Sequence, residues 1–348
     1  MLTSTHLYQE IHEQPEVLQR LFDTSQSDVQ QLAQAISSRA IDHVVIAARG
    51  TSDNAGIYGK YVLGAINGLP VSLATPSLYT IYQRPPRFGN ALVLGISQSG
   101  KSPDIVAVLA EARKQGALTA AITNSPGSNL TIECDHVIDL NAGEEKSVAA
   151  TKTYTAELAS IALLSATLSP DQKLLDELKV MPEAVAETLS MNDRIASVAP
   201  RYRYMERCVL IGRGYNYSTA FEMALKMKEL TYSVVQPYSS ADFLHGPMAL
   251  IQEGFPVVVL APSGKMESVM AEFVGQLNNH MAEVIAISDV DQVLQMAKIP
   301  LTLPRSVPEW LSPLTTIIPG QLLSLHLAHE RGYDLDSPRG LKKVTETR

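Results

Sequence analysis

Residues 91–102 read ALVLGISQSGKS, an uninterrupted apolar run that ends in hydroxyl, amide and glycine residues. A short apolar run without polar alternation is typical of a parallel strand that is covered on both faces. A second stretch of the same kind, PVVVLAPSGK, occupies residues 256–265. Ser99 and Ser263, which follow the two apolar runs, are 164 positions apart. The spacing is the first sign that the chain contains two copies of one unit.

Two further pairs of apolar runs repeat at nearly the same spacing. HVVIAARG at 43–50 and RCVLIGRG at 207–214 both end in Arg-Gly and are 164 positions apart. LTAAITN at 118–124 and EVIAISD at 283–289 are 165 positions apart. Because the strands alternate with helical segments, we predict two tandem α/β domains, each a doubly wound, flavodoxin-like αβα sandwich with a parallel sheet.

The length of 348 residues suits two such domains. The predicted organisation is an N-terminal helical segment over 1–37, a first domain over 38–168, a helical linker over 169–200, a second domain over 201–330 and a C-terminal tail over 331–348. Pro15 is expected to break or start a helix in the first segment. Residues 136–140 are expected to form a further strand, and 151–168 an amphipathic helix.

Composition excludes several classes of function. The net charge of −8 gives no broad basic surface, so we expect no nucleic-acid partner. Cys134 and Cys208 form no CxxC pair, which argues against a disulfide framework or a thiolate metal site. The N-terminus lacks the basic and apolar regions of a signal peptide, and no apolar run reaches about 18 residues. We therefore expect a cytoplasmic protein that binds no membrane.

The polar stretch 97–102 is the strongest candidate for a binding site. In open parallel sheets, ligands bind at the carboxyl ends of the strands, beside helix N-termini. Gly100 would let the backbone approach closely, and hydroxyl and N–H groups could donate to one phosphate. The spacing is not that of a Walker A loop, and a Ser-rich helix cap without a ligand is the alternative. Thr51 to Asn54 are good N-cap types after the first strand, and Ser52 among them could be a cap or a contact.

Three other places carry groups suited to proton transfer. Glu222, Lys226 and Glu229 share one helix face, which indicates either a solvated salt-bridge face or a carboxylate held over a substrate. His245 precedes a Gly-Pro turn and is either structural or presented on a loop for acid–base chemistry. The basic C-terminus is either a solvated tail or a segment that brings Lys343 into an active site.

These motifs are similar to those of a known family. Over nearly its whole length the chain resembles the double sugar-isomerase (SIS) domain proteins, through RGTSDN, SQSGKSPD, AGEEKSVAATK, ALKMKEL, HGPMALI and PRGLKKVT. The motifs look like the isomerase half of glucosamine-6-phosphate synthase. The form of RGTSD, SQSGKSPD, GEEKSVAATK and GLKKVT looks closer to the stand-alone SIS-type glucosamine-6-phosphate deaminases.

The resemblance implies a role for each matching residue. The residues that it implies at the sugar phosphate are Ser52, Ser97, Gln98, Ser99, Ser102, Val148 and Ala149. Glu229 would move a proton between C1 and C2, with Lys226 supporting its helix, and Lys343 would lie at the C1/C2 end. His245 would assist ring opening and in this family can come from the partner subunit. A homodimer with the active site at the interface, and no metal or organic cofactor, is implied as well.

Two residues depart from the synthase pattern. Asp242 stands three residues before the histidine, where the synthase usually has Glu, and its side chain reaches less far. Ala150 stands where the synthase has Ser, so one sugar contact is expected to be missing. Either change could alter the choice of substrate without changing the fold.

The resemblance leaves the reaction open between three alternatives. The synthase makes ammonia in an N-terminal glutaminase domain, for which 348 residues leave no room, so we expect the degradative reaction of a deaminase. The second alternative is a deglycase that cleaves a phosphorylated fructosamine, or another aldose–ketose phosphosugar isomerase. The deglycase would use the same site with a larger amine pocket near Lys343. A non-enzymatic sugar-phosphate sensor would not need Glu229, His245 and Lys343 together.

Overall fold

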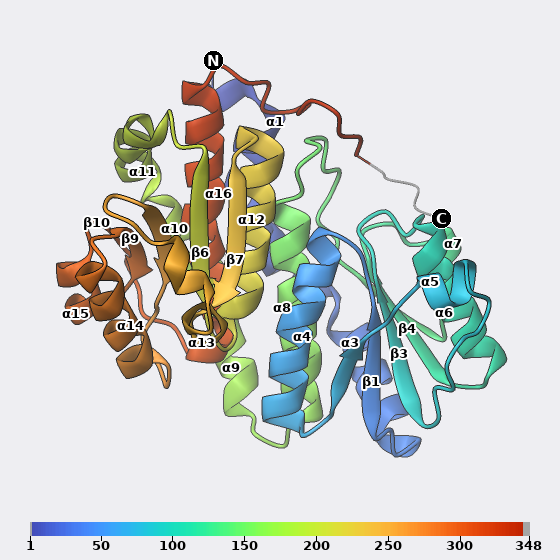
Figure 1. Ribbon diagram of the computed structural model, residues 1–348. Coiled ribbons are helices and arrows are strands. Elements are labelled where there is room, and N and C mark those ends of the chain that lie inside the picture. Colours follow the sequence, from blue (N-terminus) through green and yellow to red (C-terminus); the bar gives the residue numbers. More distant parts are fainter. Residues whose placement is uncertain (1, 344–348) are drawn as a thin grey trace. The chain divides into compact units, whose positions relative to one another are not determined.

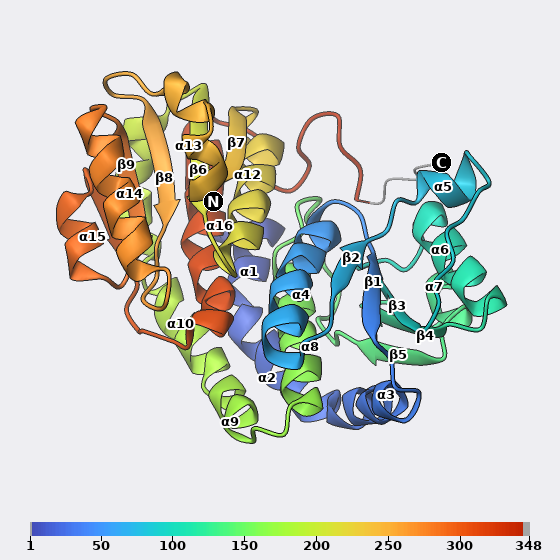
Figure 2. The same ribbon diagram turned by 60° about the horizontal axis from the view of Figure 1, so that its bottom comes forward.

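The computed structural model describes residues 2–343, which form two compact units, each around its own five-stranded parallel sheet (Figures 1 and 2). The first unit comprises residues 14–145, 152–180 and 342–343. The second unit comprises residues 2–13, 146–151 and 181–341. The predicted class, two doubly wound α/β domains with parallel sheets, is confirmed, whereas the domain limits given above stay a prediction.

In the first unit the sheet order is β2-β1-β3-β4-β5. Helices α5, α6 and α7 cover one face, and α3, α4 and α8 cover the other (Figure 1). The elements are α2 (Gln14–Thr24), α3 (Gln26–Ser38), β1 (His43–Ala47), α4 (Thr51–Asn67), β2 (Val71–Leu73), α5 (Ser77–Thr80), β3 (Ala91–Ile96), α6 (Pro103–Lys114), β4 (Leu118–Thr123), α7 (Asn129–Ile132), β5 (His136–Asp139), α8 (Lys152–Leu168) and α9 (Lys173–Lys179).

In the second unit the sheet order is β10-β9-β8-β6-β7. Helices α14 and α15 cover one face, and α12 and α16 cover the other. The elements are η1 (Leu2–Ser4), α1 (His6–His12), α10 (Met181–Leu189), α11 (Asn192–Val198), η2 (Ala199–Tyr202), β6 (Arg207–Gly212), α12 (Asn216–Thr231), β7 (Val234–Ser239), α13 (Ser240–Leu244), η3 (Pro247–Leu250), β8 (Pro256–Leu260), α14 (Glu267–Asn279), β9 (Glu283–Ser288), α15 (Asp291–Met296), β10 (Ile299–Thr302), η4 (Glu309–Leu311) and α16 (Ser312–Glu330).

The two sheets have one topology. Starting from β7, the second sheet runs in the order β7-β6-β8-β9-β10, which matches β2-β1-β3-β4-β5 strand for strand. The duplication predicted from the spacing is therefore confirmed. In this strand order the chain reverses its direction of progress across the sheet between β1 and β3, and between β6 and β8. A crevice opens at such a switch point, and it is where ligands bind in doubly wound sheets.

Three strands were not predicted from the sequence: β2, β7 and β10. All three lie in outer positions of their sheets. Edge strands need no continuous apolar run, because only one of their sides pairs with a neighbour. β7 contains Pro237 and β10 contains Pro300, and proline in a run argues against a central strand. The sequence pattern is thus weakest where the sheet itself is least buried.

Two helices differ from the sequence prediction. α4 begins at Thr51 with Gly50 as its N-cap at φ +57, so Thr51 to Asn54 lie inside the first turn and do not cap it. α8 is not amphipathic: all its residues from Lys152 to Ala166 are buried, including its hydroxyl and charged side chains. α2, α3, α4 and β4 all pack against α8, which leaves it no solvent face.

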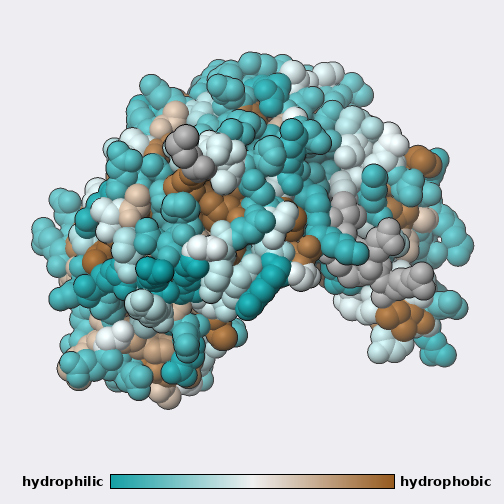
Figure 3. All heavy atoms as spheres, turned by 90° about the horizontal axis from the view of Figure 1, so that it is seen from above, coloured by the Kyte–Doolittle hydropathy of each residue, from teal (hydrophilic) through white to brown (hydrophobic). Residues whose placement is uncertain are grey.

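The surface shown in Figure 3 is largely hydrophilic, with hydrophobic residues in small separate groups. Single exposed apolar side chains are normal on folded proteins. Among the described residues, no helix combines the length and the apolar composition that crossing a lipid bilayer requires.

Substituting Gly212, at the end of β6, tests how closely β6 approaches α12. A Cβ there would lie 2.1 Å from the backbone oxygen of Asn216, which cannot move without shifting the helix. We expect Gly212→Ala to lower the free energy of unfolding by about 1–3 kcal/mol in urea denaturation. Gly275 within α14 is the matched control, because its Cβ would meet no atom within 4 Å. Gly275→Ala should be neutral or stabilising by up to about 1 kcal/mol. Equal effects of the two substitutions would contradict this packing.

Candidate active site

The switch point of the first unit lies between the loops that follow β1 and β3. Ser52 is in the first turn of α4, and its Oγ donates to Glu157 Oε1 of α8 at 2.7 Å. Both side chains are buried, at 7% and 1% exposure. A hydroxyl has one proton, so Ser52 donates either to Glu157 or to a bound phosphate, but not to both. Sequence reasoning found Ser52 and missed Glu157, whose position on a helix gave no signal.

Residues 97–102 form a tight turn at the start of α6. The N–H of Gly100 donates to the backbone oxygen and to the Oγ of Ser97, both at 3.2 Å, and the N–H of Lys101 donates to Ser99 Oγ at 3.3 Å. Ser102 is the N-cap residue of α6 without a side-chain capping bond. Ser97 is buried and Ser99 is half-buried. The turn thus brings the predicted hydroxyl groups together at the positive end of a helix, where an anion is stabilised.

Gly100 is required by this turn. Its φ is +61, and an added Cβ would lie 2.0 Å from Ser128 Oγ. The backbone oxygen of Gly100 also accepts a hydrogen bond from the Leu130 N–H at 3.1 Å. The backbone oxygen of Gln98 accepts from the Asn124 N–H at 3.1 Å, which ties the turn to the loop after β4. The turn is therefore held by its neighbours in the conformation seen here.

A charged pair joins the two loops of the switch point. Arg49 Nε, after β1, donates to Asp104 Oδ2 in the first turn of α6 at 2.7 Å. Asp104 is 2% exposed, whereas the Arg49 side chain is about half exposed. Burial raises the pKa of the neighbouring Asp53 carboxyl above its usual value, against the opposing charges of Arg49 and Lys60. The repeat analysis used Arg49 only as a landmark and did not identify this contact.

A polar cavity of about 440 Å³ adjoins the turn at the ends of β3, β4 and β5. Its lining includes Gln98, Ser99, Lys101, Glu145 and Lys343. The structure therefore brings Lys343 together with two of the predicted phosphate-binding residues. Lys343 Nζ lies 2.8 Å from Glu145 Oε2 and donates to it.

Glu145 holds this cavity wall in place. Its side chain is fully buried and also accepts from the N–H of Thr153 at 3.1 Å and from Thr153 Oγ1 at 2.8 Å. Sequence reasoning quoted Glu145 within AGEEKSVAATK without giving it a role. The bonds to Thr153 and Lys343 show it anchoring both the start of α8 and the C-terminal segment.

The second unit carries the candidate proton-transfer group on α12. Lys226 is 1% exposed, and its Nζ lies 2.6 Å from Glu229 Oε2 and 3.4 Å from Glu222 Oε1. The contact with Glu229 is an ion pair. Glu222 is fully buried, whereas Glu229 is 21% exposed. The solvated salt-bridge face considered above is thus excluded, and Glu229 is the one member of the cluster whose side chain is partly exposed.

His245 lies on an exposed turn of the second unit. It is the C-cap residue of α13, and its N–H donates to the backbone oxygen of Asp242 at 3.1 Å. Gly246 follows with φ +137, and η3 begins at Pro247. Asp242 is exposed as well. His245 is exposed on this turn, and its role in acid–base chemistry stays a prediction.

Val148 and Ala149 lie in the segment 146–151, which belongs to the second unit. The Glu10 carboxylate of α1 accepts from the N–H groups of Lys146 and Ser147. The N–H of Val148 donates to the backbone oxygen of Asp336 at 3.1 Å. Ala149 is fully buried. The structure thus leaves no exposed atom of Ala149 for a substrate, and the role implied for it stays a prediction.

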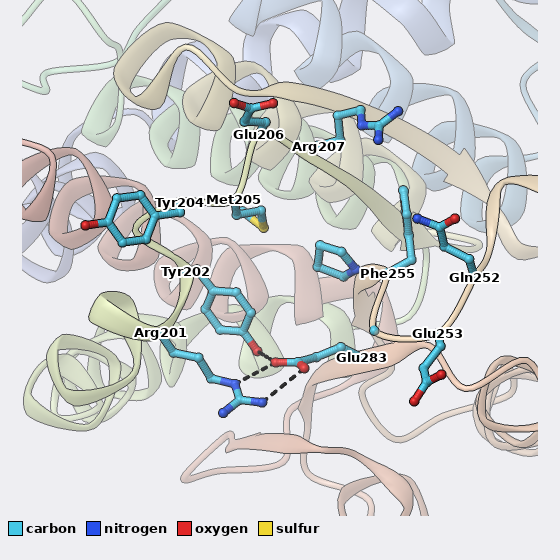
Figure 4. A pocket seen from close by; sticks show the side chains of 12 residues that line it. Arg201, Tyr202, Tyr204, Met205, Glu206, Arg207, Gln252, Glu253, Phe255 and Glu283 are labelled. Carbon is cyan, nitrogen blue, oxygen red and sulfur yellow. Dashed lines mark hydrogen bonds and ion pairs between the residues drawn. The ribbon is translucent and has the colours of Figure 1, made fainter.

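A further cavity, of about 540 Å³, lies in the second unit at the amino ends of its strands (Figure 4). It surrounds the first residues of β6, β8 and β9 and includes Glu283. Arg201 donates to both oxygens of Glu283 at 2.6 and 3.0 Å, and Tyr202 donates at 2.8 Å. The Arg201 hydrogen bond lowers the pKa of Glu283, and burial raises that of Tyr202. These groups satisfy one another, and the amino ends of parallel strands are not where doubly wound sheets bind ligands.

Metal and thiol chemistry have little support in the part of the chain that the structure describes. No group of three or more His, Cys, Asp or Glu side chains there could hold a metal ion. Cys134 and Cys208 are free, and burial raises the pKa of each thiol to about 12. A protonated, buried thiol is a poor nucleophile.

The fold is a tandem pair of flavodoxin-like domains with a hydroxyl-rich turn at residues 97–102, the candidate anion cradle, at the first switch point. The family model of the SIS domain matches residues 39–166 and 203–331. The chain therefore belongs to the SIS-domain family, which confirms the resemblance carried by the motifs.

Individual proteins show similarity over almost the whole chain. Glutamine–fructose-6-phosphate aminotransferase (isomerizing) of Thermus thermophilus is 35% identical over 352 residues, covering 97% of this chain and 58% of that protein. A solved structure from Silicibacter pomeroyi, described as a candidate phosphosugar isomerase, is 34% identical with a TM-score of 0.86, covering 95% of this chain and all of the other. Glucosamine-6-phosphate deaminase from Thermotoga maritima has a TM-score of 0.80 over 99% of this chain and all of the other, at 19% identity, a likeness of fold alone.

Gly100→Ala tests whether the turn at 97–102 is the anion cradle. The methyl group would displace Ser128 and strain the backbone, so we expect the affinity for inorganic phosphate and fructose 6-phosphate to fall about tenfold or more. Isothermal calorimetry measures this. Gly116→Ala is the control, because Gly116 has φ +80 but no atom within 4 Å of an added Cβ. Unchanged phosphate affinity in the folded Gly100→Ala protein would exclude the cradle.

Lys226→Met tests the buried cluster on α12. The substitution leaves Glu222 buried without its lysine partner, so we expect a loss of about 3 kcal/mol in the free energy of unfolding. Lys228 on the same helix is exposed, and Lys228→Met should change that free energy by less than about 0.5 kcal/mol. Urea denaturation of both variants measures the difference. Similar small losses would show that Lys226 is not needed to compensate Glu222.

Proposed function

We propose that this protein binds a hexose 6-phosphate and transfers a proton between its C1 and C2 atoms. In its finer form the proposal is a glucosamine-6-phosphate deaminase, which converts glucosamine 6-phosphate and water to fructose 6-phosphate and ammonia. The observation that carries the proposal is Glu229, a partly exposed side chain whose carboxylate is fixed by the buried ammonium group of Lys226. A fixed carboxylate that reaches solvent is suited to take up and deliver a proton.

The anion cradle supplies the binding half of the proposal. Hydroxyl and N–H groups gather at residues 97–102, beside the N-terminus of α6, and the 440 Å³ cavity next to them is large enough for a phosphorylated sugar. The Thermus thermophilus relative is named for an isomerising reaction on fructose 6-phosphate, which supports a hexose 6-phosphate as the ligand. Lys343 in the cavity wall would contact the C1/C2 end of the sugar.

The proposed chemistry needs only acid–base steps. After ring opening, assisted by His245, Glu229 removes the proton from C2 of the open-chain amino sugar and returns it to C1. The amino nitrogen gives up one proton and the C1 oxygen takes up one, by way of an enolamine, so the C1 aldehyde becomes a hydroxymethyl group and C2 becomes an imine. Water adds to the imine carbon, and ammonia leaves to give fructose 6-phosphate. No step changes the overall oxidation state of the sugar phosphate, so no oxidant or reductant is consumed.

The cavity also favours a second candidate. Acidic groups, including Asp139 and Glu144, line it together with Lys343, and they would suit a cationic amine larger than ammonia. A phosphorylated fructosamine deglycase would release such an amine by the reverse of imine formation. Comparing turnover of glucosamine 6-phosphate with that of fructoselysine 6-phosphate separates the two reactions, because only a deglycase turns over the second faster.

Solvent exchange tests the proton transfer itself. In D₂O the protein should incorporate deuterium at C1 of fructose 6-phosphate, followed by nuclear magnetic resonance. Glu229→Gln should lose about 10²- to 10⁴-fold of this rate while it still binds the sugar phosphate. Glu253 is exposed, and Glu253→Gln makes the same chemical change at a different site, so it should leave the deuterium exchange rate unchanged. An unaltered exchange rate in Glu229→Gln would remove Glu229 from the reaction.

A further inference from the structure

The second unit contains a copy of the anion cradle. Residues Ser263-Gly264-Lys265 follow β8, 164 positions after Ser99-Gly100-Lys101 that follow β3. β8 lies between β6 and β9, as β3 lies between β1 and β4. The copy therefore stands at the second switch point, just before the N-terminus of the 13-residue helix α14. By its place in the fold it has the N–H groups that an anion needs.

In this copy the chain's own carboxylates take the hydrogen bonds. Glu309 Oε2 accepts from the N–H of Lys265 at 2.8 Å, and Glu309 Oε1 accepts from that of Met266 at 3.3 Å. Gly264 has φ +146, and an added Cβ would lie 2.5 Å from the Glu309 carboxyl carbon. The carboxylate is thus packed directly onto the glycine and accepts from the N–H groups of the two residues that follow it.

A second carboxylate closes the serine end. Asp289, after β9, accepts from both the N–H and the Oγ of Ser263 at 2.6 Å. Because the proton of Ser263 goes to Asp289, Ser306 must donate to Ser263 across their 2.7 Å contact. The corresponding turn at 97–102 is different: the bonds described above tie it to backbone carbonyls and hydroxyl groups, which are neutral.

Glu309 also fixes the element that follows it. It is the first residue of η4, which leads directly into α16. Its backbone oxygen accepts from Ser312 Oγ at 2.7 Å, and Ser312 Oγ in turn accepts from Asn216 Nδ2 at 2.7 Å. The carboxylate and backbone of one residue therefore join the turn after β8 to the starts of α16 and α12.

We propose that the second switch point is an anion cradle closed by the chain's own Glu309. Asp289 accepts the hydrogen bonds that Ser263 would otherwise donate to an anion. Glu309 takes the place that a phosphate would take, so each chain binds one phosphate group, in the first unit. Removing the Glu309 carboxylate opens a second site for inorganic phosphate. The contacts within the second unit support the closed cradle independently of the function proposed above. Only the claim that the first unit binds the phosphate rests on that function.

Counting bound phosphate tests this. Equilibrium dialysis with inorganic phosphate should give one more phosphate per chain for Glu309→Ala than for the wild-type protein. The melting temperature of Glu309→Ala, lowered in chloride, should recover with phosphate at equal ionic strength. Glu267→Ala is the matched control: Glu267 is exposed in the first turn of α14, and its loss removes the same charge near the same helix end. It should bind no additional phosphate.

The outcomes are distinct. A wild type that binds none and a variant that binds one would keep the closed cradle and count against the function proposed for the first unit. Equal numbers in Glu309→Ala and the wild type, or an extra phosphate in Glu267→Ala as well, would overturn the inference. If Glu309→Ala does not fold, Glu309→Gln decides: it keeps one acceptor without the charge and should still gain a weaker second phosphate site. No gain in that variant would overturn the inference as well.

Discussion

The order of the strands determines where polar groups can gather in this protein. After β1 the chain continues toward one edge of the sheet, and after β3 it continues toward the other. β1 and β3 lie at the centre of a buried sheet, and their following loops lead to α4 on one face and α6 on the other. The loop after β1 leads into the N-terminus of α4 with Ser52, and the loop after β3 carries Ser97 and Ser99 into the N-terminus of α6. The Arg49–Asp104 pair then links the two loops through a buried carboxylate. The position of the cradle therefore follows from the strand order, whichever side chains line it.

Duplication gave the protein two such crevices, and the two have diverged. In the first, Gly100 packs against Ser128, and the turn is held by neutral groups. In the second, Gly264 packs against Glu309, and the charge that a ligand would bring is already supplied by the chain. The second unit instead holds a buried charged cluster on α12, where Lys226 pairs with Glu222 and Glu229. One copy is thus suited to binding an anion, and the other to holding a carboxylate.

Much of this could be predicted from sequence, for physical reasons. Central strands are buried on both faces, so their apolar runs are continuous and their repeat is visible; β2, β7 and β10 lie at the edges and leave no such trace. Lys226 and Glu229 were predicted as a pair by helix periodicity, but not the burial of Lys226. Partners distant in sequence, such as Glu157 for Ser52 and Glu309 for Lys265, could not be found, because nothing local marks them. Helix α8 was predicted to be amphipathic, yet neighbours on every side bury its hydroxyl groups.

The most direct test of the account follows both products of one reaction. Purified protein is mixed with glucosamine 6-phosphate, and ammonia and fructose 6-phosphate are measured in parallel. The account predicts that the two appear in equal amounts, at a rate that depends on the Glu229 carboxylate. If neither product appears while glucosamine 6-phosphate still raises the melting temperature, the cradle stands, but the proposed deaminase reaction is contradicted.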